Sequence, residues 1–256
     1  ENYEKYWDDI APFIKFGCLK DEKFAEKMND YILFKNLDGK YLTLKDCLEE
    51  NKEKHENKVF YVTDEKEQSQ YINMFKEAGL DAVILPHSID SPFIGHLEQK
   101  NEGLKFLRID ADLNDTFKEE VKEDDEVFKK NAETLTTVFK KALGNDKLEI
   151  KVEKLKNEGI ASMLTVSEES RRMQDMMKMY NMYGMDPNMF GGQETLVLNA
   201  NHPLVKYLAE NQESDKAPLI CEQLYDLAMM SHKQLSPDEM TRFVQRSNEI
   251  LLMIAK

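Results

Sequence analysis

The sequence of 256 residues lacks most of the motifs that identify enzymes and membrane proteins. No apolar run approaches the ~18 residues that a membrane-spanning helix requires. The ten glycines form neither G-x-G-x-x-G nor G-x-x-x-x-G-K-S/T, and the five scattered histidines form no H-E-x-x-H motif. A G-x-S-x-G motif is missing as well. We therefore expect no membrane partner, no metal site and no catalytic residue.

The sequence is also poor in cysteine and in positive charge. Its three cysteines, Cys18, Cys47 and Cys221, are an odd number and widely spaced, which is typical of reduced thiols in a cytoplasmic protein. The 35 basic and 49 acidic side chains give a net charge of −14, which argues against binding to nucleic acid or to an anionic membrane. We therefore expect a cytoplasmic protein that binds neither.

Helical and strand patterns alternate in the first half of the sequence. Apolar residues recur at helical spacing from Tyr3 to Ile14. Gly17 is expected to end this helix, and Asp21 is expected to begin the next. Three runs with strand composition then alternate with helical patterns: strands at 59–63, 81–85 and 104–109, and helices at 66–78 and 91–99. The pattern predicts a helical segment that leads into a small three-stranded parallel αβα sandwich.

The second half has a different pattern, of the α+β class. An acidic run at 119–126 separates the two halves. We therefore expect two domains, residues 1–120 (helical over 1–57, αβα over 58–115) and residues 121–256. The second domain is predicted to contain a small sheet and a terminal helix pair: strands at 148–155, 160–166 and 195–198, and helices at 128–143, from Ser167, from Pro203, at 217–232 and at 236–255.

Half of the fourteen methionines lie between Met173 and Met189. At 100° per residue, one arc of the helix expected after Ser167 gathers five apolar side chains, which we call the Met stripe: Met173, Met176, Met177, Tyr180 and Tyr183. Spacing alone favours a helix that packs on a core. Methionine, however, suits surfaces that must fit many partners, so an exposed stripe is the alternative.

The last two predicted helices carry broad apolar faces. The side chains that could form an interface are Leu224, Leu227, Phe243, Ile250, Leu251 and Ile254. A helix pair with this much apolar surface could close its own core, or it could pair with a second copy into a four-helix bundle. The spacing is compatible with both.

Several segments together resemble a known family. The similar segments are Tyr3–Trp7, Ile14–Gly17, Val59–Thr63, Ala78–Leu85, Ile89–Asp90 and Leu196–Val205. The first five resemble the middle domain of heat shock protein 90 (Hsp90) chaperones of the bacterial HtpG type, and the last resembles their C-terminal domain. Their order and spacing agree from Glu1 to Lys256. The sequence departs from the family at Leu33, where an arginine is usual, and at Pro92, where many members have a large aromatic residue and this chain places one next, at Phe93.

The resemblance implies a chaperone fragment that contains the rear of the middle domain and the C-terminal dimerisation domain. In this family ATP and magnesium bind to a preceding domain, and an arginine of a preceding subdomain reaches the phosphates. The resemblance therefore implies that the fragment is not an enzyme and holds no cofactor. It also implies that the Met stripe and Phe93 contact unfolded or partly folded client proteins, and that the final helices form a homodimer.

Two other functions remain open. A small α/β enzyme would hold its substrate at the strand ends near Pro86, His87 and Asp90, although no recognisable nucleophile or phosphate-binding loop accompanies them. A purely structural dimer module would have no client site at all.

Overall fold

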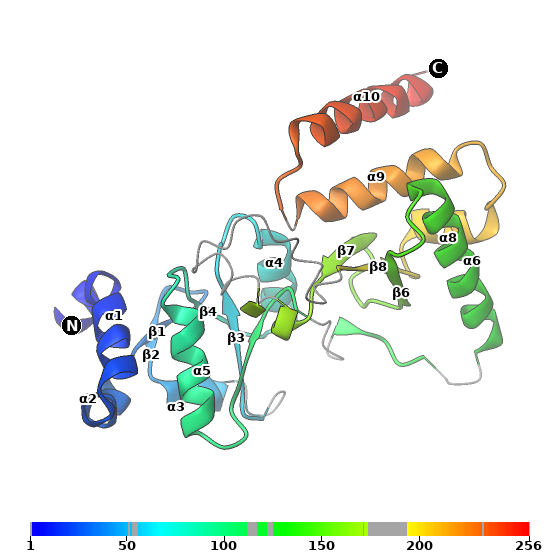
Figure 1. Cartoon of the computed structure of the whole chain (residues 1–256). Helices are drawn as coiled ribbons and strands as arrows, with labels where there is room; N and C mark the ends of the chain where they lie inside the picture. Colours follow the sequence, from blue (N-terminus) through cyan, green and yellow to red (C-terminus); the bar gives the residue numbers. More distant parts are fainter. Residues whose placement is uncertain are drawn as a thin grey trace. The chain divides into compact units, whose positions relative to one another are not determined.

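The computed structural model describes residues 2–50, 52, 56–111, 117–121, 125–170, 172–173, 194–231 and 233–255, and they form two compact units (Figure 1). The first unit contains the residues up to Ala111 together with the helical segment that begins at Glu168. The second unit contains the described residues from Phe117 to Ser167 and from Glu194 onward. The domain boundary expected between residues 120 and 121 stays a prediction, and the two units are described separately.

The first unit is built on a three-stranded parallel sheet, as the alternating pattern predicts. Its elements are α1 (Asn2–Lys20), α2 (Glu22–Met28), a 3-10 turn (Asn29–Tyr31), β1 (Phe34–Lys35), β2 (Tyr41–Leu42), α3 (Leu44–Glu50), β3 (Lys58–Val62), α4 (Ser69–Glu77), β4 (Val83–Ile84), α5 (Asp90–Lys100) and β5 (Lys105–Arg108). The strand order is β4-β3-β5, and β3 pairs in parallel with both neighbours. The antiparallel β1–β2 hairpin was not expected from the sequence.

Helices pack on both faces of this sheet. Successive side chains of a strand point to opposite faces. Phe60 of β3 meets Phe75 of α4 edge to face, with ring centroids 4.9 Å apart. Its neighbour Val59 belongs instead to the core that contains Phe93 and Leu97 of α5 (Figure 1). The helix α1 packs against α5 and completes this side of the unit.

The expectation that Gly17 ends the first helix is wrong, because α1 continues to Lys20. A Cβ atom at Gly17 would lie 2.8 Å from a ring carbon of Phe24, which belongs to α2. Gly17 is therefore needed for the close approach of the two helices rather than for a helix end. The prediction for Asp21 is confirmed, since its carboxylate accepts hydrogen bonds from the backbone of Lys23 and Phe24 at the start of α2.

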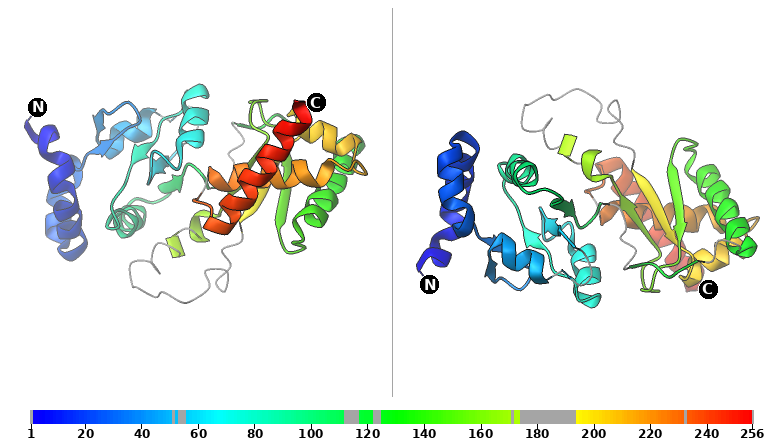
Figure 2. Two further views of the ribbon diagram at one scale, coloured as in Figure 1. Left: turned by 90° about the horizontal axis from the view of Figure 1, so that it is seen from above. Right: turned by 90° about the horizontal axis from the view of Figure 1, so that it is seen from below.

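The second unit combines helices with a small mixed sheet. Its elements are α6 (Glu126–Leu143), β6 (Glu149–Glu153), β7 (Ser162–Thr165), β8 (Thr195–Asn199), α8 (Pro203–Glu210), α9 (Ala217–Met230) and α10 (Pro237–Ile254). The strand order is β6-β8-β7, with β8 parallel to β6 and antiparallel to β7. The helices α6, α8 and α9 enclose a core with the sheet, and α10 packs against α9 (Figure 2). In the described part of the chain, no helix is both long enough and apolar enough to cross a membrane.

The side chain of Asn199 joins two loops of the second unit at the end of β8, the β6–β7 connection and the β8–α8 connection. It is completely buried. Its amide group donates to the carbonyl oxygens of Asn157 and Ile160 at 3.0 and 2.8 Å, and its oxygen accepts from the backbone N–H groups of Leu155 and Asn201 at 3.0 Å each. Backbone groups buried in these loops would otherwise lack partners, which is costly.

We expect Asn199→Ala to lower the free energy of unfolding of the second unit by about 2–4 kcal/mol, because four backbone groups lose their partner. Urea denaturation followed by far-UV circular dichroism measures the change. The control is Asn211→Ala, an exposed amide that bonds only one carbonyl among the described residues, that of Tyr207, and should cost under about 1 kcal/mol. Equal losses in both variants would contradict this role of Asn199.

Candidate functional site

A short helical segment begins at Glu168 and carries the first residue of the Met stripe. Ser167 precedes it and acids occupy positions 168 and 169, which favours a helix start because the helix dipole attracts negative charge there. Met173 is 39% exposed. The other four members of the stripe, Met176, Met177, Tyr180 and Tyr183, lie outside the described residues. Met173 itself is exposed, and exposure of the rest of the stripe stays a prediction.

Arg172 attaches this helical segment to the edge of the first unit's sheet. Its guanidinium forms a bidentate pair with Glu98 of α5, at 2.6 and 3.1 Å, and a further bond with Glu168 at 2.8 Å. It also donates to the carbonyl oxygen of Phe106 in β5 at 2.9 Å. Burial alone would lower the pKa of Arg172, but the hydrogen bonds that its guanidinium donates to the two carboxylates raise it above its usual value. The cluster therefore remains charged and paired.

The two carboxylates of this cluster also bind the backbone of β5. Glu98 accepts a hydrogen bond from the N–H of Phe106 at 2.7 Å, and Glu168 accepts one from the N–H of Arg108 at 2.8 Å. Glu168 also accepts from the hydroxyl of Tyr61 at 2.7 Å. Burial and the neighbouring Glu168 charge raise the pKa of Tyr61 well above its usual value, so the phenol stays a donor. The segment that leads into the Met stripe is thus held by side-chain bonds to a strand edge.

Phe93 lies in the core of the first unit, not on its surface. Its side chain is 1% exposed and packs among the residues between α5 and the sheet. The expected client contact at Phe93 does not fit this burial. The reason is the helix register, since Phe93 and Leu97 are four residues apart and share the inner face of α5. Pro92 is the exposed residue at this point of the helix.

The six residues expected at a dimer interface fall into three groups. Leu224 is 3% exposed and belongs to the core of its own unit, so it is a packing residue there. Phe243 and Ile250 are half-buried. Leu227, Leu251 and Ile254 are exposed, Ile254 to 76%. The sequence pattern predicted one interface from all six residues, because buried and exposed side chains are alike apolar and the pattern does not tell them apart.

Arg246 occupies the contact between α9 and α10, where apolar side chains of α10 would otherwise pack. Its guanidinium is buried against α9, where it pairs with Asp226 at 2.7 Å and with Glu222 at 3.0 Å. Gln223 and Ser247 add a hydrogen bond between the two helices at 3.2 Å. The contact between α9 and α10 therefore contains a polar seam, which leaves apolar side chains of α10 on its outward side. Those exposed are Met240, Val244, Leu251, Leu252, Met253 and Ile254.

Sequence reasoning missed Arg246 and Arg172, which organise the two candidate surfaces. A weak signal existed for the first, since Glu222 and Asp226 are spaced one helical turn apart and could flank one cation. The partners of Arg172 are 4 and 74 positions away, and only the folded chain brings Glu98 to it. Met240 was missed as well, although it continues the stripe of Leu251 and Ile254.

The enzyme hypothesis places a substrate at the strand ends near Pro86. A pocket of about 310 Å³ lies there, lined in part by Pro86, His87 and Lys15. Its buried charges are already paired, because Lys15 forms an ion pair with Asp90. The same carboxylate accepts the backbone N–H of His87 at 2.8 Å. Within the described residues, no three His, Cys, Asp or Glu side chains gather so that they could hold a metal ion. The arrangement is that of a structural ion pair.

We expect Arg172→Met to lower the free energy of unfolding of the first unit by about 2–3 kcal/mol, because it leaves the Glu98 and Glu168 carboxylates half-buried without their cation. Fluorescence of Trp7, the only tryptophan and a core residue of this unit, follows the transition in urea. The matched control is Arg242→Met on the exposed side of α10. If both variants are equally stable, Arg172 does not have the role that its contacts indicate.

Comparison with known proteins finds matches in one protein family. A family model described as Hsp90 protein matches residues 1–255. The chaperone protein htpG of Bacteroides fragilis strain YCH46 is 32% identical over 225 residues, which cover 83% of this chain and 32% of that protein. The chaperone protein HtpG of Porphyromonas gingivalis strain ATCC 33277 is 28% identical over 233 residues, 86% of this chain and 33% of that protein. The HtpG of Pseudoalteromonas translucida is 25% identical across the whole chain and 41% of its own length.

The chain spans about a third of the length of the first of these relatives. The family match, by contrast, covers nearly all of the chain. The protein therefore belongs to the Hsp90 family, and its curated relatives are chaperones of the HtpG type.

Proposed function

We propose that this chain is the client-binding and homodimerising part of an HtpG-type molecular chaperone. The observation that carries the proposal is the outward face of α10. Met240, Val244, Leu251 and Ile254 fall within an arc of about 80° on this helix, and all four are exposed. Ser247 lies within the same arc and bonds to Gln223 of α9, so the apolar side chains form two exposed groups on either side of it. Apolar surface of this extent is ordinarily covered, because its contact with water costs free energy in proportion to its area.

A second copy of the chain is the simplest cover for this stripe. Two-fold symmetry brings the same face of both copies together, and two helix pairs then form a four-helix bundle. Phe243 and Ile250 flank the stripe on the side towards α9 and would widen such an interface. Leu227 and Met230 of α9 are exposed as well and extend the apolar surface.

Client binding is proposed at the Met stripe. Support comes from Met173, which is exposed while its neighbour Arg172 is anchored to the sheet edge. Flexible methionine side chains can adapt to different apolar partners, so binding is expected to be weak and tolerant of sequence. The net charge of −14 favours basic or unfolded partners over acidic ones.

We assign no catalytic residue, metal or cofactor to this chain. By the family resemblance, ATP and magnesium are bound by another part of the complete chaperone. The buried and free state of Cys18, Cys47 and Cys221 suits the reducing conditions expected of a cytoplasmic protein.

We expect the chain to be a dimer, with a mass by light scattering of about twice 29.9 kDa. Leu251→Glu should convert it to a monomer at micromolar concentration, because it places a charge in the centre of an apolar interface. Gln245→Glu is the matched control, since it adds the same charge to an exposed position outside the stripe. A monomeric wild type would refute the dimer, and dissociation of both variants would show that charge alone is responsible.

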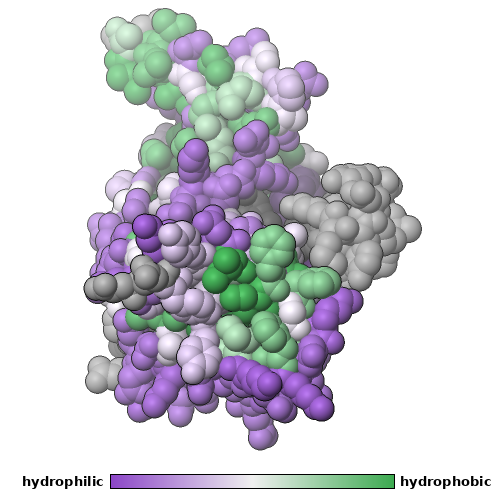
Figure 3. Space-filling model, turned by 90° about the vertical axis from the view of Figure 1, so that its left-hand side faces the viewer, coloured by the Kyte–Doolittle hydropathy of each residue, from purple (hydrophilic) through white to green (hydrophobic). Residues whose placement is uncertain are grey.

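We expect the combined substitution of Met173, Met176, Met177 and Tyr180 by Ser to abolish suppression of aggregation of a heat-unfolded test protein, measured by turbidity. The fold and the dimer should persist, because an exposed stripe contributes little to the core. The control is Phe13→Ser with Phe16→Ser, which removes apolar surface where such side chains gather on α1 (Figure 3).

The outcomes of this experiment separate the proposal from its rivals. Unfolding of the fourfold variant would show that the stripe is core. Absence of any suppression by the folded wild type would favour a purely structural dimer module. Equal loss in the α1 control would show that general surface stickiness, rather than the Met stripe, holds the clients.

A further inference from the structure

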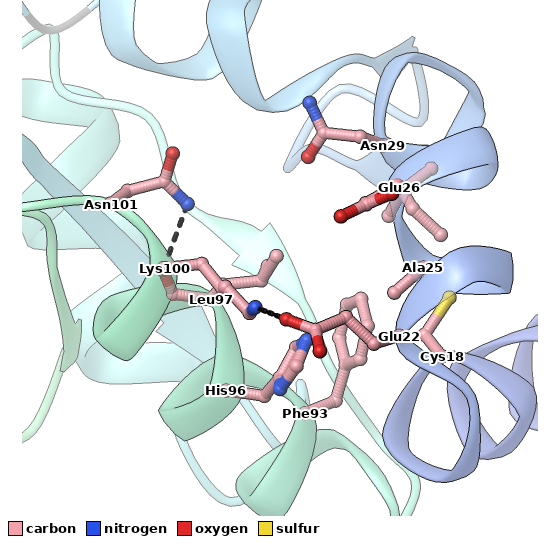
Figure 4. A pocket seen from close by; sticks show the side chains of 11 residues that line it. Cys18, Glu22, Ala25, Glu26, Asn29, Phe93, His96, Leu97, Lys100 and Asn101 are labelled. Carbon is pink, nitrogen blue, oxygen red and sulfur yellow. Dashed lines mark hydrogen bonds and ion pairs between the residues drawn. The ribbon is translucent and has the colours of Figure 1, made fainter.

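A cleft in the first unit lies outside the surfaces described so far. It is formed by α1 and α2 on one side and by α5 on the other, and its volume is about 330 Å³ (Figure 4). This size is at the lower end of the range for sites that bind small molecules. Every element of the cleft belongs to the same unit. The cleft therefore does not depend on dimerisation or on the Met stripe.

The floor of the cleft is apolar and rigid. Phe93, Leu97 and Ile32 are buried side chains of the main core whose surfaces also line the cleft. Cys18 lies beside them, and burial raises the pKa of its thiol, so it contributes apolar surface rather than a nucleophile. An aromatic or branched alkyl group can replace water on such a floor at a gain in free energy.

The mouth of the cleft is polar and carries an excess of negative charge. Glu22 and Lys100 form an ion pair that links α2 to α5, and the hydrogen bond from Lys100 lowers the pKa of Glu22. Among the described residues the Glu26 carboxylate has no hydrogen bond and no ion pair, and its charge is felt by Lys100 only at longer range. Figure 4 shows this carboxylate projecting from α2 towards the cleft. With His96 counted as neutral, two carboxylates and one ammonium leave one negative charge at the mouth.

We propose that this cleft binds a small amphipathic organic cation, with its apolar body on Phe93 and Leu97 and its ammonium group on Glu26. Charge complementarity selects this class of ligand. A carboxylate or phosphate would be repelled by Glu22 and Glu26, and a neutral ligand would leave the Glu26 carboxylate without its counter-ion. The amide of Asn29, also at the mouth, supplies a second polar group for the ammonium through its oxygen.

The geometry also predicts a consequence of binding. The cleft separates the α1–α2 pair from α5, and among the described residues that line it the Glu22–Lys100 pair is the ionic link across it. A ligand that contacts both sides holds them together, and binding to the folded state alone stabilises that state. Occupation of the cleft should therefore raise the stability of the first unit.

The test uses the whole chain and 2-phenylethylamine as the probe, with 2-phenylethanol as a neutral ligand of the same size. Methyl signals of Ile32 and Leu97 in a carbon–proton correlation spectrum report binding at the cleft itself. We expect saturable shifts with a dissociation constant on the order of 0.1–1 mM for the amine, the affinity usual for a ligand of this size. The alcohol should bind at least about tenfold more weakly, because a charge-assisted hydrogen bond is lost.

Two variants decide the role of Glu26. Glu26→Gln should weaken amine binding about tenfold and leave binding of the alcohol unchanged, since only the charge is removed. Glu4→Gln, an exposed acid near the start of the same helical pair, is the matched control and should bind as the wild type does. Both positions are exposed, so the fold should persist, which circular dichroism confirms.

Three results would overturn the proposal. They are the absence of saturable methyl shifts at Ile32 and Leu97, equal affinity for the amine and the alcohol, and unchanged amine affinity in Glu26→Gln. Because these readouts are insensitive to dimer mass and to client aggregation, they do not depend on the outcome of the chaperone experiments.

Discussion

The unpaired edge of strand β5 is the constraint from which much of the first unit follows. In the order β4-β3-β5, the outer amides and carbonyls of β5 have no strand beside them in the described part of the chain, and such an edge must be covered or paired. Glu98 and Glu168 take two of the amides, and Arg172 takes the carbonyl of Phe106. The two carboxylates converge on one strand edge, and the guanidinium between them offsets their repulsion. The unpaired backbone groups of β5 thus hold Glu168 and Arg172, at the start of the helical segment, by hydrogen bonds. Met173, the next residue, stays exposed.

In the second unit, charged side chains lie between two helices rather than at a strand edge. Its last two helices meet partly through Arg246, Glu222 and Asp226, which are groups that other proteins place on the surface. A polar seam binds two helices in one register, because each hydrogen bond has a single geometry. It also leaves the apolar residues of α10 on the outside, among them Leu251 and Ile254. Polar groups inside and apolar groups outside are what a helix pair needs when a further partner completes its core.

Periodicity in the sequence was enough to place most of the helices and strands, but not the short β1–β2 hairpin. It also failed where a single contact between distant residues determines the role of a side chain. The parallel sheet and the helix start at Asp21 follow from local patterns, and the structure confirms both. Gly17 was misjudged because its role depends on the ring of Phe24, which a local pattern does not show. Leu224 was assigned to a surface because an apolar residue looks the same in sequence whether it faces inward or outward. Phe93 was assigned to one because the family resemblance implied a client contact there, and the structure buries it. The family resemblance identified which helices matter, but their orientation came from contacts such as that of Arg172 with Glu98.

The net charge of −14 and the exposed apolar side chains have opposite effects on association between copies of the chain, since charge repels and apolar contact attracts. Two copies of an acidic protein repel each other in most orientations, and this repulsion extends over roughly a Debye length, about 8–10 Å in physiological salt. Apolar attraction acts only at contact, so it prevails only where a large complementary face is buried at once. The apolar stripe on α10 extends over about four turns, and we propose that it meets its own copy in that way. The net charge therefore opposes random association, and the dimer proposed above requires that the apolar face of α10 outweigh this repulsion.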